Sequence, residues 1–183
     1  MNWLKKILGG SIDNEDRKLE EAFNAKDLKR KIVDAISIFL KEHKFKRSGL
    51  TFSLTRNDLI YYIQIQSSPA STATVYILTV NTGIVSTQLC ELIGIDKPGY
   101  LDSHWRKRIG FYLDQPTDKW WTIDNVVNAE VASNEISFLL EKRVLPNLFT
   151  YASTKDLENF WLDGNCEGLT LMQRTDYLKL LGH

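Results

Sequence analysis

The sequence has few cysteines and histidines and no long hydrophobic run. Its two cysteines, Cys90 and Cys166, lie far apart and form no Cys-x-x-Cys motif, so we expect two reduced thiols in a cytoplasmic protein. The three histidines are scattered, and we expect neither a metal nor a cofactor. No stretch approaches the roughly 20 apolar residues of a membrane-spanning helix. We therefore expect no membrane partner.

An excess of one sign of charge is also missing. Lys and Arg together number 23, Asp and Glu together number 23, and the formal net charge is zero. A dedicated nucleic-acid binder needs a basic excess to displace counterions from phosphates. Nucleic acid is therefore not an expected partner, although a local basic stripe is not excluded.

The composition is typical of one globular domain. The chain has 183 residues, of which 43% are hydrophobic and 25% charged, which is enough to bury a core. Residues 11–21 are charged and poor in large apolar side chains, whereas regular patterning starts near residue 26. We interpret residues 1–25 as an N-terminal appendage or linker and residues 26–183 as a single α+β domain.

Hydrophobic periodicity predicts one helix, then a group of strands, then further helices. Apolar residues recur at helical spacing over residues 27–44, with Asp27 as the N-cap, and again after residue 131. Alternation predicts strands at residues 50–56, 59–67, 74–85, 104–113 and 120–123. Strands grouped in this way and joined by short turns are antiparallel. We expect an antiparallel sheet of about four to five strands with the N-terminal helix and the C-terminal helices packed on one face.

One side of the predicted strands is polar. If the strands align, amide, imidazole and guanidinium groups meet there, edged by Tyr62 and Tyr112 and by one of two adjacent tryptophans, because neighbours along a strand point to opposite faces. Such a patch suits an anionic or hydrogen-bonding ligand. An ordinary solvent-facing side of a sheet is the alternative. The candidate ligand-binding residues are Gln64, Gln66, Asn81, His104, Arg106, Arg108, Trp120 and Trp121.

Five short blocks of sequence follow one another in a distinctive order. They are Phe45-Lys46-Arg47-Ser48-Gly49-Leu50-Thr51-Phe52, Ile63-Gln64-Ile65-Gln66, Val80-Asn81-Thr82-Gly83, His104-Trp105-Arg106-Lys107-Arg108-Ile109-Gly110 and Lys119-Trp120-Trp121-Thr122-Ile123. Over roughly residues 27–160 the chain resembles an uncharacterised bacterial family, the domain of unknown function 4304. The resemblance implies no activity, because none is assigned to the family.

No catalytic set stands out. His104 could act as a general base, but the sequence places no nucleophile or acidic orienter beside it, except Asp102 if the strand extends that far. Cys90 lies in the apolar run Gln-Leu-Cys-Glu-Leu, which is typical of a buried thiol. Glycine-rich phosphate loops, nucleophile elbows and metal motifs are not found.

The leading hypothesis is a non-enzymatic binding or protein-interaction module of a bacterial cytoplasm, with a protein partner or a small anionic ligand. One alternative is an enzyme for a small anionic substrate, in which His104 is the acid–base group and Arg106 and Arg108 hold the anion. A second alternative is a toxin-neutralising, immunity-type protein that binds its partner through Trp120 or Trp121.

Overall fold

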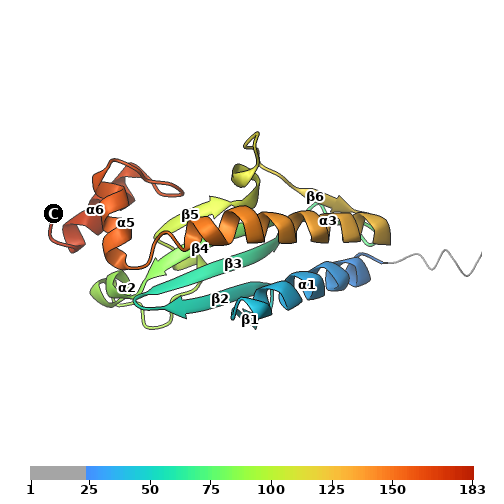
Figure 1. Ribbon diagram of the computed structural model, residues 1–183, viewed down its shortest axis with the longest axis horizontal. Coiled ribbons are helices and arrows are strands. Elements are labelled where there is room, and N and C mark those ends of the chain that lie inside the picture. Colours follow the sequence, from blue (N-terminus) through green and yellow to red (C-terminus); the bar gives the residue numbers. More distant parts are fainter. Residues whose placement is uncertain (1–23) are drawn as a thin grey trace, which may run out of the picture.

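The structure is a computed structural model that describes residues 24–183. A long helix, a group of strands and a second group of helices follow one another along the chain (Figure 1). The predicted appendage, residues 1–25, lies almost wholly outside the described residues. Among the described residues, no helix is both long and apolar enough to cross a membrane.

Six antiparallel strands form one open sheet. They are β1 (Lys46–Ser48), β2 (Thr51–Arg56), β3 (Leu59–Ser67), β4 (Tyr76–Ser86), β5 (Trp105–Arg108) and β6 (Trp121–Ile123). The first five neighbour one another in chain order, and β6 pairs with the start of β4. The predicted α+β class and antiparallel sheet are confirmed. Only β1 was missed, because all three of its residues are exposed and no burial alternates along it.

The helices occupy both sides of the sheet. They are α1 (Ala25–Glu42), α2 (Thr87–Ile93), the 3-10 turns η2 (Tyr100–Asp102) and η3 (Ile109–Tyr112), α3 (Val126–Leu139), the π-helical segment η4 (Leu140–Val144), α4 (Leu145–Leu148), α5 (Thr154–Leu162) and α6 (Leu171–Leu180). The first helix begins earlier than predicted. Asn24, not Asp27, is its N-cap, and the Asn24 side chain accepts the Asp27 N–H at 3.0 Å.

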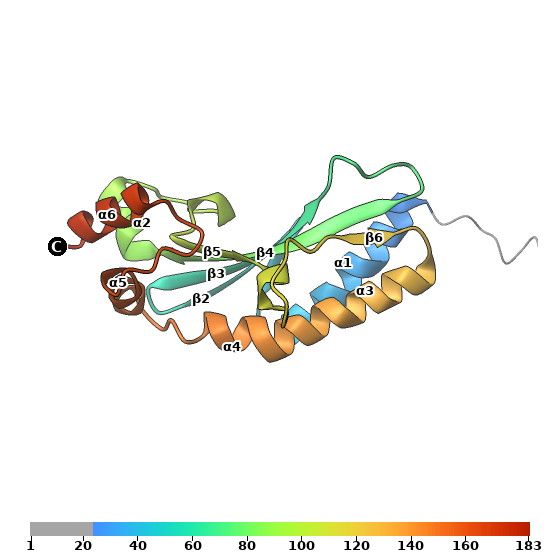
Figure 2. The same ribbon diagram turned by 90° about the horizontal axis from the view of Figure 1, so that it is seen from above.

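The main core lies between the sheet and two long helices. Figure 2 shows α1 and α3 on the same side of the sheet. The apolar stripe of α1, which includes Ile32 and Ile36, is fully buried. In β3 the alternate residues Tyr61, Ile63 and Ile65 are buried against this layer, as the spacing predicts.

The opposite face is covered at one end only. A second, smaller core joins Tyr62, Val85 and Cys90, and the segment that follows α2 packs against it. At the same end α6 places Tyr177 edge-on against His104, with ring centroids 4.8 Å apart. Figure 2 shows α2 and α6 on this side. Two hollows open on the rest of this face.

The strand predicted at 104–113 is much shorter than expected. β5 ends at Arg108, and the chain turns through η3. Gly110 allows the turn, because a Cβ there would lie 2.2 Å from the Thr117 carbonyl oxygen of the returning loop. Tyr112 therefore does not edge the polar side. It is buried in the main core and donates its hydroxyl to Asn147 Oδ1 at 3.0 Å.

A close approach at Gly83 fixes the segment that borders the open face. A Cβ at Gly83 would lie 2.3 Å from Ser103 Oγ and 2.9 Å from Ser103 Cβ. We expect Gly83→Ala to lower the free energy of unfolding by about 1–3 kcal/mol through overpacking, as measured by urea denaturation. Gly99→Ala is the control, since its Cβ would meet nothing closer than 3.8 Å. Equal losses in the two variants would contradict this account.

Candidate functional site

Cross-strand register brings five of the predicted site residues to one surface. Gln64 lies opposite Asn81, and Asn81 lies opposite Arg108. Two residues further along each strand, Gln66 and Arg106 point to the same side, because side chains alternate. This side faces away from α1 and α3. We call it the polar face.

A hollow of about 620 Å³ opens on the polar face at β5. It has a polar floor, apolar walls and a charged rim. The floor consists of Asn81, Arg106 and Arg108, the walls of Tyr100, Phe111 and Pro116, and the rim of Lys107, Glu167 and Gly168. A second hollow, of about 590 Å³, lies on the other side of Tyr100 and reaches Gln64 and Ser53. Tyr100 thus divides the open face into two compartments.

Arg108 is held in a network of side chains. Its Nε donates to Asn81 Oδ1 at 3.0 Å, and its Nη1 donates to Asp118 Oδ1 at 2.5 Å. Asn81 in turn donates to Gln66 Oε1 at 2.8 Å. The Arg108 hydrogen bond holds the pKa of Asp118 below its ordinary value. Because its charge and its donors are largely used, Arg108 acts mainly as a structural part of the floor.

Arg106 is placed differently. Its Nε donates to the Ser103 carbonyl at 3.2 Å, its Nη2 donates to the Leu101 carbonyl, and its guanidinium lies 6.0 Å from the Tyr100 ring centroid. No carboxylate in residues 24–183 forms an ion pair with it, and no described atom accepts from Nη1. The guanidinium is therefore fixed in position while its charge stays unneutralised.

The free edge of β5 is closed by a segment from the end of the chain. The Arg106 N–H donates to the Glu167 carbonyl at 3.3 Å, and Lys107 Nζ pairs with Glu167 Oε1 at 2.7 Å. Gly168, with φ of 73°, is pressed against the strand, since a Cβ there would lie 2.3 Å from the Arg106 carbonyl oxygen. Residues 166–169 thus form one rim of the hollow.

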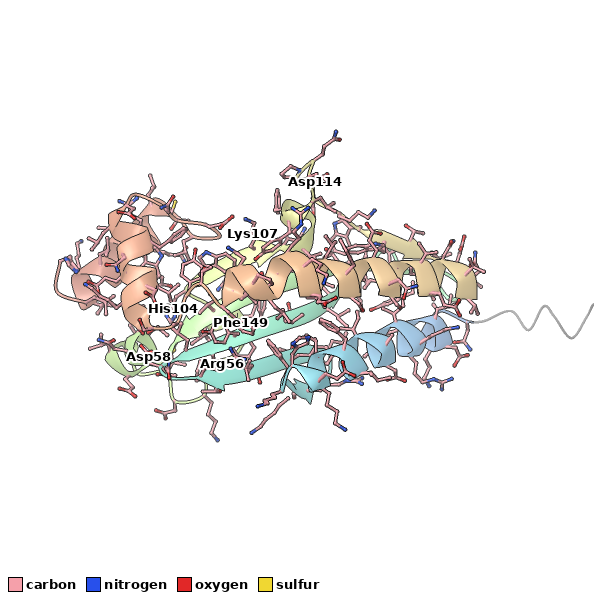
Figure 3. The ribbon with its side chains drawn as sticks, in the orientation of Figure 1. Arg56, Asp58, His104, Lys107, Asp114 and Phe149 are labelled. Atoms are coloured by element: carbon pink, nitrogen blue, oxygen red, sulfur yellow. The ribbon has the colours of Figure 1, made fainter. Side chains whose placement is uncertain are left out.

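Contrary to the prediction, His104 is not part of the open polar face. Only 1% of it is exposed, because α2 and α6 cover its end of the sheet. Its Nδ1 accepts the Ser86 N–H at 3.0 Å, and burial lowers its pKa from 6.5 to about 4. Figure 3 shows His104 at the same end of the molecule as Asp58, away from Lys107 and Asp114.

The two adjacent tryptophans point to opposite faces. Trp120 is half-buried on the polar face, with its ring 5.3 Å from the Arg108 guanidinium. Trp121 is buried in the main core, and its Nε1 donates to Glu135 Oε2 at 2.7 Å. Trp120 therefore borders the floor of the hollow, whereas Trp121 has no access to it.

Comparison with known proteins places the chain in a family. Residues 36–149 match the model of a family described as a domain of unknown function, DUF4304. The chain belongs to the DUF4304 family. Searches of curated proteins and of solved structures found no match. The resemblance seen in the sequence is thereby confirmed. The matched part of this DUF4304 domain holds the floor and walls of the hollow but not the rim at 166–169.

Sequence reasoning missed several groups that shape the site of this DUF4304 domain. Asp118, the carboxylate that pairs with Arg108, was not among the predicted site residues. Phe111 falls within the strand predicted at residues 104–113, yet 47% of it is exposed on the hollow, because β5 ends before it. The run of turn-forming residues Gln115-Pro116-Thr117-Asp118 is the signal that could have revealed a loop returning to β5. No local signal points to Glu167.

The buried His104 should make stability depend on pH. Above pH 6.5 the His104 ring is neutral in both the folded and the unfolded chain, so it does not lower the free energy of unfolding. Below that, the unfolded chain binds a proton that the folded one takes up only near pH 4, so the free energy of unfolding falls as pH falls. We expect a total loss of about 3 kcal/mol between pH 6.5 and 4, measured by urea denaturation.

The matched control is His104→Asn, whose Oδ1 can accept the Ser86 N–H but does not titrate. The difference between the two pH profiles isolates the histidine from the carboxylates. Parallel profiles for the two proteins would contradict a neutral, buried His104.

Proposed function

We propose that this DUF4304 domain is a non-enzymatic binding module of a bacterial cytoplasm. Its hollow on the polar face would hold the anionic group of a small ligand or of a protein partner. Arg106 carries the proposal. A partly buried charge is normally paired, yet this one has no described carboxylate and lines an open hollow. Anions fit such a guanidinium, because its planar donors match carboxylate and phosphate oxygens.

The chemistry around the hollow supports binding over catalysis. His104, the acid–base group of the enzymatic alternative, is enclosed by α2 and α6 and accepts a main-chain N–H. Glu167 is the one carboxylate among the described lining residues, and it is paired with Lys107. Cys90 and Cys166 are both free, which fits the reducing compartment that we propose.

A toxin-neutralising role is a second candidate. Trp120 is half-buried beside Arg108, and this pair of residue types is common where protein partners bind tightly. The partner would then supply the anion as an acidic side chain. Size-exclusion chromatography after co-expression with the product of the neighbouring gene tests this idea. A complex that Trp120→Ala leaves intact would count against it.

The primary proposal predicts weak binding of simple anions at Arg106. In ¹⁵N–¹H correlation spectra we expect acetate and inorganic phosphate to shift the Arg106 Nε–H and the β5 amides, with dissociation constants on the order of 1 mM. Arg106→Gln should weaken binding at least tenfold, because the charge is lost while hydrogen-bonding groups remain.

Arg30→Gln is the control, since Arg30 lies on α1, on the other side of the sheet, and its side chain is 72% exposed. Loss of binding in both variants, or in neither, would overturn the assignment of the anion site to Arg106.

A further inference from the structure

Within residues 24–183, the ion pairs around the hollow leave one lining cation without a carboxylate partner. Arg108 is neutralised by Asp118 at 2.5 Å, and Lys107 is neutralised by Glu167 at 2.7 Å. Among the described lining residues, Arg106 is the cation that has no carboxylate partner. The site therefore complements a single negative charge, whereas a dianion would bring a second negative charge close to the Asp118 and Glu167 carboxylates.

The donors of Arg106 set how an anion can bind. Main-chain carbonyls occupy the Nε N–H and one N–H of Nη2, so both N–H groups of Nη1 and the second N–H of Nη2 are left for a ligand. Bidentate binding across Nε and Nη2 is blocked by the same two carbonyls. The two oxygens of a carboxylate can still bind the outer pair of N–H groups, one on Nη1 and one on Nη2.

The walls above Arg106 are apolar and include flat side chains. Tyr100 and Phe111 offer aromatic faces and Pro116 a saturated ring. Phe111 is 47% exposed, although Ile109, two residues before it, is fully buried. Aromatic side chains stack with other flat rings in offset or edge-on geometry. An exposed phenyl ring next to a fixed cation therefore suits a ligand with both a ring and a charge.

The size of the hollow points the same way. A volume of about 620 Å³ falls within the range of about 300–1,000 Å³ that is usual for small-molecule sites. A simple inorganic ion would fill a small part of it and leave the walls uncovered.

We infer that the ligand of this hollow is a flat ring that carries one negative charge, an aromatic monocarboxylate or a close relative. Its carboxylate binds the free N–H groups of Arg106 Nη1 and Nη2, and its ring lies between Tyr100, Phe111 and Pro116. This inference rests on the proposed function, because it names the ligand class of the same site.

Four probes separate the ring from the charge. 2-Naphthoate has both, 2-naphthalenemethanol has the ring alone, acetate has one charge alone, and inorganic phosphate has a higher charge without a ring. Titrations of the full chain, followed in ¹⁵N–¹H spectra, should give 2-naphthoate at least a tenfold higher affinity than any other probe. The shifts should centre on Arg106, Phe111 and Gly168.

Two variants test the two halves of the site. Phe111→Ala should weaken 2-naphthoate at least fivefold and leave acetate unchanged. Its control is Phe138→Ala on α3, since Phe138 is 56% exposed on the far side of the sheet. Asp118→Asn should release the charge of Arg108 and raise the affinity for phosphate relative to 2-naphthoate.

The outcomes are distinct. Equal affinity for acetate and 2-naphthoate would overturn the proposal that the ligand carries a ring, while the anion site at Arg106 would stand. Tighter binding of phosphate than of 2-naphthoate by the unmodified chain would overturn the single charge. No shift at Arg106 with any anion would overturn both this inference and the proposed function.

Discussion

The pairing of β4 on both of its edges is the constraint on which the structure depends. Nine of its eleven residues pair with β3 along one edge, while β6 and then β5 pair with it along the other. This register buries Val80 and Ile84 against α1 and α3 and turns Asn81 toward the polar face. A one-residue slip would send Asn81 into the core and an apolar side chain outward. Core and site are therefore fixed by the same hydrogen-bond ladder.

The two arginines of β5 show how one strand can place a paired and an unpaired cation side by side. Both point to the polar face, two residues apart. Arg108 lies opposite Asn81 and meets Asp118 from the returning loop, so its charge is neutralised. Arg106 lies opposite Gly83, where no side chain can pair with it, and main-chain carbonyls hold it instead. The glycine that admits Ser103 thus also leaves Arg106 uncompensated.

Alternation along the sequence predicted which way the strand residues point, but not what covers them. Gln64, Gln66, Asn81, Arg106 and Arg108 lie on the side that their spacing indicates. His104 follows the same alternation, yet it is buried, because Tyr177 of α6 reaches it from 73 residues further along the chain. The prediction for Tyr112 is wrong for another reason, because β5 ends before this residue and the chain turns through η3. Local periodicity predicts the face of the sheet to which each side chain points. Which elements cover that face, and where a strand ends, depend on distant contacts and tight turns.

These contacts explain why one end of the polar face is covered and the other is open. At one end α2 and α6 bury His104 and Cys90 and add a second core, which stabilises the sheet but leaves no room for a ligand. At the other end residues 166–169 reach only the edge of β5, where Gly168 contacts the Arg106 backbone. That rim lies outside the part of the chain that matches the family model, whereas the floor lies within it. The floor is therefore the part of the site that belongs to the DUF4304 fold. The rim adds Glu167, which neutralises Lys107 and so lowers the net positive charge around the hollow.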